Sequence, residues 1–355
     1  MKKIIIPICL LILFIPKINA STTSATSYVL MDQTTGRVLK SKDMNSKRLI
    51  ASITKIMTCI LALESGKTEE IVLVDDSIKE AYGSGVYIEV GEEIKLKDLL
   101  YGLMLRSGND AATMIATYIS GSEETFVQLM NQKAKEIGMK NTTFYTSSGL
   151  PTPHGNYSSA YDMALLTKYA MQNKEYQEIV STKKYKVTTN KKTYIWNNKN
   201  KLLNYDYITG GKTGYTEESG RTLVSTATID NMNLIVVTIR DSDDWNTHLE
   251  LYNYTKDNYI SYKVLNKNKF KLYGDTYYKN ATFYIKNDVY LPLAKEEKKS
   301  LISHIILEKK KKYNTNDKIG INQIYLGKEL LYEEDIYITK ENKRKINKIK
   351  EWFSD

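Results

Sequence analysis

The sequence predicts an α+β protein that ends in a small, separate β-domain. Strand-like segments lie at both ends of the first 262 residues, and helical patterns fill the middle. Such an order favours one sheet that takes strands from both ends of this part, with the helices packed against it. From about residue 263 onward the chain shows short runs in which apolar and polar residues alternate, which indicates further strands.

The first predicted elements are a hairpin and a helix. Residues 27–33 and 36–40 contain apolar runs joined through a Thr-Thr-Gly sequence, which predicts a β-hairpin. In residues 52–65 isoleucine and leucine recur at helical spacing, and Gly66 ends the pattern. Cys59 lies within this helix, where we expect it to be a small buried core residue.

The middle of the chain is mainly helical in its pattern, and we expect a helical subdomain at roughly 75–180. Four segments show helical periodicity, with Gly, Ser, Asn and Pro in the loops between them: 97–105, 110–120, 122–137 and 159–172. A second hairpin is predicted at 184–196. Three strands and a closing helix follow, at 207–213, 221–229, 232–240 and 243–260.

The first twenty residues have the layout of a secretory signal. Lys2 and Lys3 precede an apolar run that is short for a membrane span, and small residues follow Ala20. An uncleaved anchor is the alternative, and in either case we expect the chain to leave the cytoplasm. Apart from Cys9 in this leader, Cys59 is the one cysteine, so we expect no internal disulfide. The expected parts are a leader at 1–20, a main domain at 21–262, a β-domain at 263–338 and a tail at 339–355.

The net charge of +10 is unevenly distributed along the chain. Residues 263–355 hold 21 basic and 13 acidic residues, whereas residues 21–262 are close to neutral, with 27 basic and 28 acidic residues. For an exported protein we expect no nucleic-acid partner, so the counterpart of this charge is an anionic membrane or wall polymer. Compositional drift in a lysine-rich chain is the alternative.

The tail has the pattern of a short basic helix. Ile346, Ile349 and Phe353 share one helical face, Trp352 lies beside it, and basic residues surround them. This pattern predicts attachment to an anionic membrane surface. A final helix packed on its own domain is the alternative.

A hydroxyl and an amine lie three residues apart at Ser52 and Lys55. On a helix these side chains share a face, and a helix N-terminus favours the negative charge that develops during nucleophilic attack. Lys55 can act as a base only if its pKa falls, through burial or through nearby positive charge such as that of Lys212. A serine with such a neighbour is a candidate nucleophile.

Two further motifs turn the Ser52 and Lys55 pair into a specific signal. A second S-x-x-K sequence at 181–184, which we interpret as a solvated loop before a strand, shows that the spacing alone is weak evidence. S-G-N at 107–109 follows Ser52 by 55 residues, in a loop between two helical patterns. K-T-G at 212–214 follows 105 residues later, at the end of a predicted strand. Each triplet occurs once in the chain.

With these motifs in this order, the sequence resembles the low-molecular-mass penicillin-binding D-alanyl-D-alanine carboxypeptidases of the serine β-lactamase-like superfamily. Supporting stretches include ASITKIMT, GSGVYIEVGE, LLYGLMLRSGNDAA and GGKTGYTEESG. The resemblance covers roughly residues 27–260. It implies a β-lactamase/DD-peptidase-like domain, in which helices flank an antiparallel sheet beside an all-helical subdomain. Members of this family often add a C-terminal β-domain and an amphipathic tail.

The resemblance implies catalytic roles for four residues. Ser52 corresponds to the acylated nucleophile and Lys55 to its base. Ser107 is expected to relay protons between the lysines and the leaving amine. The backbone N–H groups of Ser52 and Tyr215 are expected to form the oxyanion hole.

Substrate-binding roles follow from the same resemblance. Asn109 is expected to bond to the substrate backbone, and Lys212 with Thr213 to hold the terminal carboxylate. Gly214 lets the strand approach the substrate closely. Lys199 matches a basic position near that carboxylate.

The implied activity is removal of the terminal D-alanine from peptidoglycan stem peptides, through an acyl-enzyme on Ser52, with β-lactams as covalent inhibitors and without a cofactor. A β-lactamase on the same fold is disfavoured, because the loop 146–162 contains no Glu to organise a deacylating water. A DD-endopeptidase uses the same residues and stays open as an alternative. A non-catalytic penicillin-sensing or wall-binding module is disfavoured, because such a module could lose several site residues that this chain retains.

The sequence predicts no metal site, since its three histidines are scattered and no His, Cys or carboxylate cluster has ligand spacing. His154 lies in a proline-containing loop and suggests a Ser–His arrangement. No carboxylate is evidently placed to orient it, so we interpret it as an exposed loop residue. His248 and His304 are weaker candidates.

Overall fold

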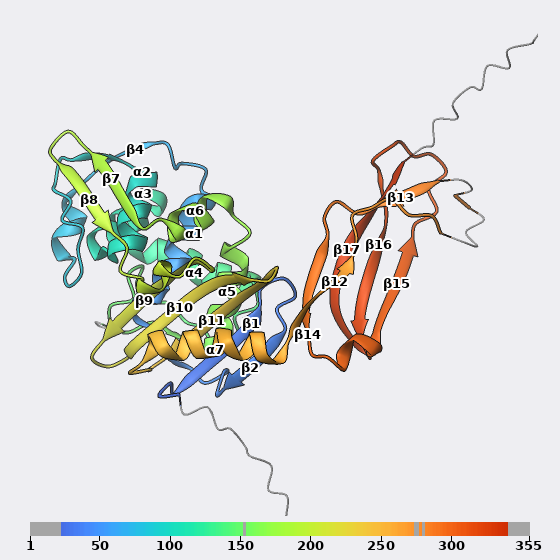
Figure 1. Ribbon diagram of the computed structural model, residues 1–355. Coiled ribbons are helices and arrows are strands. Elements are labelled where there is room, and N and C mark those ends of the chain that lie inside the picture. Colours follow the sequence, from blue (N-terminus) through green and yellow to red (C-terminus); the bar gives the residue numbers. More distant parts are fainter. Residues whose placement is uncertain (1–22, 152–153, 273–276, 279–280, 340–355) are drawn as a thin grey trace, which may run out of the picture.

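The computed structural model describes residues 23–151, 154–272, 277–278 and 281–339. Within them, a larger α+β body precedes an elongated β-domain (Figure 1). The leader expected at 1–20 lies outside the described residues, and so does the predicted tail from residue 340 onward. None of the helices in the described part of the chain has both the length and the apolar composition needed to span a bilayer.

A five-stranded antiparallel sheet forms the centre of the α+β body, in the order β2-β1-β11-β10-β9. The strand from the N-terminal hairpin pairs directly with the last strand of the body, so the predicted sheet with strands from both ends is confirmed. The strands are β1 (Ser27–Asp32), β2 (Val38–Lys42), β9 (Ile208–Thr216), β10 (Gly220–Ile229) and β11 (Met232–Ile239).

Both faces of this sheet are covered, which explains the continuous apolar character of β1. Side chains alternate across a strand, so Val29 and Met31 join the core under the helices, while Tyr28 and Leu30 join the core under α7 (Asp244–Asn258). In Figure 1, α7 lies on one side of the sheet and the remaining helices lie on the other. The predicted closing helix is therefore confirmed.

The helical layer contains α1 (Lys55–Glu64), α2 (Leu96–Tyr101), α3 (Asn109–Ser120), α4 (Glu123–Glu136), α5 (Ala160–Ala170) and α6 (Lys174–Ser181). No pattern in the sequence predicted α6, because it has eight residues, of which three are buried. Cys59 is fully buried in α1, as predicted. Short turns of 3-10 helix lie at Asp76–Glu80, Lys201–Asn204 and Glu297–Ser300.

Two predicted helices are irregular where they approach the S-x-x-K and S-G-N motifs. The helix expected from residue 52 begins as a 3-10 turn, η1 (Ala51–Thr54), before α1. The helix expected at 97–105 changes from α2 into a π turn, Gly102–Arg106, which Ser107 ends in the left-handed region at φ 66°. A non-glycine residue there is strained by roughly 1–2 kcal/mol.

Three two-stranded ribbons surround the helices. They pair β3 (Arg48–Leu49) with β6 (Tyr157–Ser158), β4 (Ile71–Leu73) with β5 (Glu93–Lys95), and β7 (Lys184–Thr188) with β8 (Thr193–Asn197). The last ribbon is the hairpin predicted at 184–196. Its Tyr185 stacks on Tyr101 with ring centroids 3.7 Å apart, which fixes the hairpin against α2.

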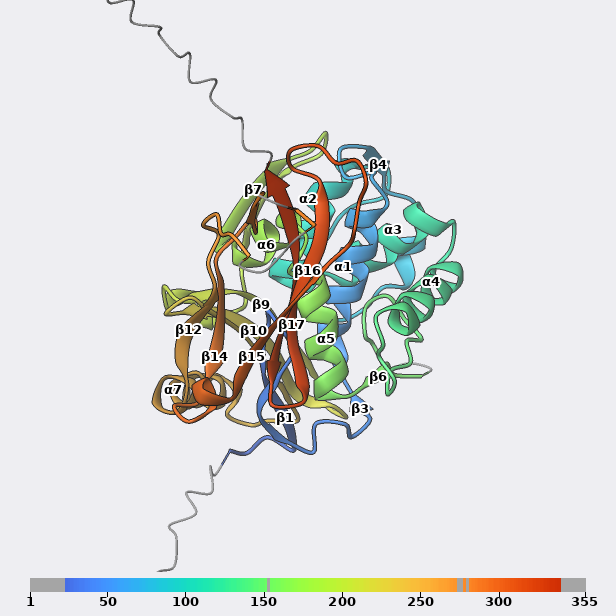
Figure 2. The ribbon, with the colours of Figure 1, turned by 90° about the vertical axis from the view of Figure 1, so that its right-hand side faces the viewer.

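The C-terminal part is a β-domain with its own core. A four-stranded sheet in the order β13-β17-β16-β15 lies beside the pair β12–β14. Figure 2 views the molecule from this side. The strands are β12 (Ile260–Leu265), β13 (Thr282–Tyr284), β14 (Val289–Leu293), β15 (Leu301–Leu307), β16 (Lys318–Leu326) and β17 (Glu329–Thr339). Strand β12 already begins at residue 260, before the boundary expected at 263.

Arg37 connects the β-domain to the α+β body. From the turn between β1 and β2 its guanidinium forms an ion pair with Glu297, with Nη1 3.0 Å from Oε2, and also donates to the carbonyl of Pro292. Both side chains of the ion pair are largely shielded from solvent. Because two nitrogens of the guanidinium face the two oxygens of the carboxylate, the pair fixes the geometry of this contact between the β-domain and the α+β body.

Candidate active site

The 3-10 turn η1 places Ser52 directly beside Lys55. A 3-10 helix has three residues per turn, so side chains at i and i+3 are eclipsed. The Nζ atom of Lys55 accordingly lies 3.1 Å from Oγ of Ser52. The turn starts at Ala51, whose φ of 48° lies in the left-handed region. Serine and lysine thus meet as predicted, but through a strained 3-10 turn instead of the first turn of a regular α-helix.

Lys55 is fully buried, and all of its hydrogen-bonding capacity as an ammonium is used. Besides Ser52, it donates to Oδ1 of Asn109 at 2.8 Å and to the carbonyl of Ser148 at 2.6 Å. Burial, together with the positive charge of Lys199, lowers the pKa of Lys55 to about 7. At neutral pH a large fraction of Lys55 is therefore the free amine, which can accept the Ser52 proton.

The S-G-N motif brings its two polar side chains to two different lysines. Asn109 is the first residue of α3 and is buried; its amide nitrogen donates to the carbonyl of Tyr82 at 2.6 Å. Asn109 therefore contacts Lys55 and the backbone of the neighbouring loop, and its expected bond to the substrate backbone stays a prediction. Ser107 instead accepts from Nζ of Lys212 at 3.0 Å.

The K-T-G motif lies inside β9 and not at its end, because pairing with β10 continues to Thr216. Lys212 is buried, and besides Ser107 it donates to the carbonyl of Thr213 at 2.7 Å. Burial lowers the pKa of Lys212 well below its usual value, and the charges of Lys55 and Lys199 act in the same direction. A positive charge on Lys55 or Lys199 therefore disfavours protonation of Lys212.

Gly214 is required by the close approach of β9 to the nucleophile. A Cβ at this position would lie 2.9 Å from the backbone nitrogen of Ser52 and 2.4 Å from Oγ1 of Thr222. Thr222 in turn donates to the carbonyl of Ile50 at 3.0 Å. Any side chain at 214 would push the strand away from Ser52.

A cleft of about 390 Å³ opens above these residues and is lined by cations. It exposes the predicted Ser52, Ser107, Thr213, Gly214, Tyr215 and Lys199, while Lys55, Asn109 and Lys212 lie beneath it. The sequence patterns missed five further lining residues: Ser84, Lys201, Arg221, Asp244 and Trp245. Their side chains come from four separate segments, so no local motif indicated them.

Arg221 is the most conspicuous of the missed residues. Its Nη2 atom lies 2.6 Å from Oδ1 of Asp244, whose side chain is buried, and its guanidinium carbon lies 5.4 Å from the ring centroid of Trp245. The pairing of β9 with β10 sets Arg221 opposite Tyr215, a relation that follows from the hairpin register. Lys199 reaches the same cleft and donates to Ser84 Oγ at 3.2 Å. Arg221 and Lys199 thus place two cationic side chains at the cleft.

A scan against protein families matches residues 16–243 to the peptidase S11 model, described as D-alanyl-D-alanine carboxypeptidase. The chain belongs to the peptidase S11 family. Residues 259–344 match a second model, the C-terminal domain of penicillin-binding protein 5. The predicted resemblance is thereby confirmed, and so is the predicted fold class with its additional β-domain.

Curated relatives of this S11 chain carry the same kind of name. It is 40% identical over 220 residues to the D-alanyl-D-alanine carboxypeptidase DacF of Bacillus subtilis, an alignment that covers 60% of this chain and 56% of that relative. It is 36% identical over 241 residues to DacC of Escherichia coli, covering 64% and 59%. The chain therefore spans less than two thirds of the length of these relatives.

Solved structures show the S11 fold over most of the chain. Penicillin-binding protein 5 from Haemophilus influenzae superimposes with a TM-score of 0.70 at 28% identity, covering 90% of this chain and 97% of that one. The carboxypeptidase DacD from Francisella tularensis gives 0.66 at 25% identity, covering 96% of both. Both parts of the chain are therefore shared with solved proteins.

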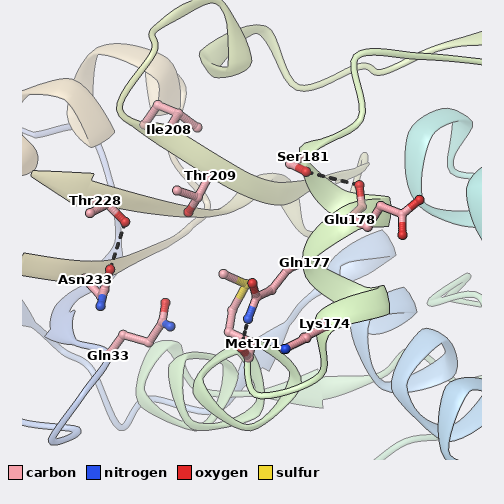
Figure 3. Close-up of a pocket in the computed structure, with 10 residues that line it drawn as sticks. All are labelled: Gln33, Met171, Lys174, Gln177, Glu178, Ser181, Ile208, Thr209, Thr228 and Asn233. Carbon is pink, nitrogen blue, oxygen red and sulfur yellow. Dashed lines mark hydrogen bonds between the residues drawn. The ribbon is translucent and has the colours of Figure 1, made fainter. Parts of the chain in front are cut away.

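A larger cavity of about 630 Å³ lies elsewhere on this S11 protein, between the far ends of β9–β11 and helix α6 (Figure 3). It includes Ser181 of the second S-x-x-K sequence. Ser181 is an exposed residue at the end of α6, where its hydroxyl donates to the carbonyl of Glu178 at 3.1 Å. We expected a solvated loop at 181–184 that leads into a strand. Instead, α6 extends to Ser181, and the strand β7 begins at Lys184.

The histidines lie apart from the cleft of this S11 protein. His154 is exposed, with its ring 5.4 Å from that of Tyr145. His248 is buried between Ser225 and Thr238, and burial lowers its pKa to about 3, so it stays neutral. His304 lies exposed on β15. Among the described residues, no three His, Cys, Asp or Glu side chains are grouped as a metal site.

Proposed function

We propose that this protein is a serine D-alanyl-D-alanine carboxypeptidase that releases the terminal D-alanine of peptidoglycan stem peptides. The observation that carries the proposal is the contact of Ser52, which lines the cleft, with the buried Lys55, a lysine with a pKa of about 7. Membership of the S11 family supports the substrate class. The names of the curated relatives support it as well.

In acylation, Oγ of Ser52 attacks the carbonyl between the two D-alanines while the neutral Lys55 amine takes its proton. Backbone N–H groups of Ser52 and Tyr215 stabilise the oxyanion. The peptide C–N bond then breaks and an ester forms on Ser52. The proton that Lys55 took is passed to the leaving D-alanine amine through Ser107, which is hydrogen-bonded to Lys212, so Lys55 is again a neutral amine. Water, deprotonated by Lys55, hydrolyses the ester and restores the free hydroxyl.

The carboxylate of the leaving D-alanine is held, in this proposal, by the Thr213 hydroxyl together with Arg221 and Lys199. These side chains line the cleft, whereas Lys212 is buried and bonded within the protein. Lys212 therefore takes part in the proton path and does not contact the carboxylate. The resemblance implied that Lys212 binds the terminal carboxylate. We assign this role to Arg221 instead, because the cleft exposes Arg221.

The function is tested by incubating purified protein with diacetyl-L-Lys-D-Ala-D-Ala and measuring free D-alanine. We expect release with this peptide and a strong loss with its C-terminal amide, which lacks the carboxylate that the cationic cleft binds. Rapid hydrolysis of penicillin without D-alanine release would instead show a β-lactamase. Stable penicillin acylation without any peptide turnover would show a sensing module.

We further propose that the chain is exported and that its tail holds it on an anionic membrane surface. The support is the leader pattern at 1–20, the excess of basic residues after 262, and the apolar face of the tail. A chain ending at Thr339 keeps β17 whole.

The shortened chain is expected to keep full activity on a soluble peptide and to stop pelleting with anionic vesicles. The chain from residue 21 to 355 should pellet at low salt and less at high salt, because salt screens the attraction. Equal pelleting of both forms at low salt, or none by either, contradicts the tail's role.

A further inference from the structure

A third cavity, of about 290 Å³, is distinct from the cationic cleft. Its walls come from the segment that leads into the 3-10 turn, from the loop before β6 and from the tip of the β9–β10 hairpin. The side chains that define its chemistry are those of Leu49, Tyr145, His154, Tyr157 and Glu218. None of them takes part in the mechanism proposed above.

Two walls of the cavity lie close to the reacting groups along the chain. Leu49 precedes Ser52 by three residues and Glu218 follows Tyr215 by three. Because an extended chain advances at most about 3.3–3.6 Å per residue, each of these walls begins within about 11 Å of an oxyanion-hole residue. The bond from Thr222 to the Ile50 carbonyl holds the hairpin against the nucleophile segment.

The direction of the substrate leads into this cavity. In the proposed function, on which this inference rests, the terminal carboxylate lies by Thr213 and the scissile carbonyl lies between Ser52 and Tyr215. Since β9 runs from Thr213 through Tyr215 towards the hairpin, the residue that precedes the two D-alanines lies on the side of Glu218. One extended residue plus a lysine-length side chain reaches about 10 Å, which is similar to the length of chain that joins Tyr215 to Glu218.

The chemistry of the cavity suits an amine. Glu218 is exposed, and its carboxylate forms no ion pair with any residue in the described ranges. The exposed rings of Tyr145 and Tyr157 offer faces that attract cations. An ammonium entering the cavity therefore meets a free carboxylate and aromatic faces together.

Two cations near the cavity moderate its attraction for an amine. Lys47 lies with Nζ 5.9 Å from the ring centroid of Tyr157 and donates to Thr143. Arg240 donates to the backbone carbonyl of Glu218. Neither is paired with the Glu218 carboxylate, so the site keeps its acceptor, but we expect a preference of several-fold and not of orders of magnitude.

We propose that this cavity is a specificity subsite for the amine-bearing side chain of the stem-peptide residue that precedes D-Ala-D-Ala, with Glu218 as its acceptor. The test compares Nα-acetyl-L-Lys-D-Ala-D-Ala, which has a free ε-amine, with the same peptide acetylated at that amine. For the protein itself we expect kcat/KM to be about 5–10-fold higher for the free amine. In Glu218→Gln the two peptides should become equal, through a fall for the free amine alone.

Glu217→Gln is the matched control, because Glu217 is the exposed neighbouring carboxylate and does not line the cavity. It removes the same charge and should keep the preference. Equal kcat/KM values for the two peptides in the unmodified protein, or an equal loss of preference in both variants, would overturn the subsite. The second result would show a general field effect.

A peptide boronic acid, made with and without the free amine, separates this proposal from the proposed function. It bonds to the serine without turnover, so the ratio of penicillin-labelling inhibition by the two compounds reports the contribution of the free amine in the cavity. If neither peptide releases D-alanine, the carboxypeptidase function is refuted while the ratio of the two boronic acids still decides the subsite. A ratio near one in the unmodified protein refutes the subsite by itself.

Discussion

Replacing Ser52 with alanine is expected to abolish both D-alanine release and the covalent penicillin adduct. The oxygen that forms the ester is lost, and with it the hydroxyl that lies 3.1 Å from Nζ of Lys55, whose pKa is lowered to about 7. In serine hydrolases the loss of the nucleophile lowers kcat by a factor on the order of 10⁶. Intact-mass analysis after penicillin treatment measures the adduct directly.

Ser181→Ala is the matched control for this experiment, because Ser181 begins the second S-x-x-K sequence but lies exposed at the end of α6. It should keep the adduct and the full rate. An adduct that persists in Ser52→Ala, or one that disappears in Ser181→Ala, would refute the assignment of the nucleophile.

The acylation rate is expected to rise with pH through a midpoint near 7, because Lys55 must be neutral to take the serine proton. Burial lowers the pKa of Lys55 to about 7, so below that pH the protonated fraction grows and the rate falls by about tenfold per unit. Above the midpoint the rate should level off. Lys55→Arg should lose this rise and at least about 10²–10⁴ of the rate, since a guanidinium stays protonated.

Lys199→Gln provides the electrostatic control. The charge of Lys199 lowers the pKa of Lys55, so its removal should move the midpoint of the acylation profile to higher pH. The quantity to compare is the midpoint of the pH profile and not the maximal rate, because Lys199 also lines the cleft and its removal changes substrate binding. A flat profile in the unmodified protein, or a downward shift in Lys199→Gln, would contradict Lys55 as the base. Thermal unfolding of each variant checks that the fold is retained.

Several features of the site were determined by the sequence itself. The three-residue spacing of Ser52 and Lys55 suffices for contact, because any helical turn of this size brings i and i+3 together. The single occurrence and order of the S-G-N and K-T-G motifs indicated their convergence. The apolar strands near both ends predicted a shared sheet, since each needs a partner to satisfy its backbone hydrogen bonds.

Other features were decided by tertiary packing alone. Asn109 contacts Lys55 because α3 begins where the chain leaves the strained residue Ser107, and no spacing rule expresses that geometry. Arg221, Asp244 and Trp245 meet because β10 and α7, which β11 separates in the chain, both begin at the same cleft.

The sequence thus determined which groups this protein carries and which of them are neighbours along the chain. Only the tertiary structure decided the protonation state of these groups and which distant residues they contact. The lowered pKa of Lys55 and Lys212 arises from burial by segments far apart in the sequence. Desolvation depends on everything packed around a charge, and that environment exists only once the whole domain has folded.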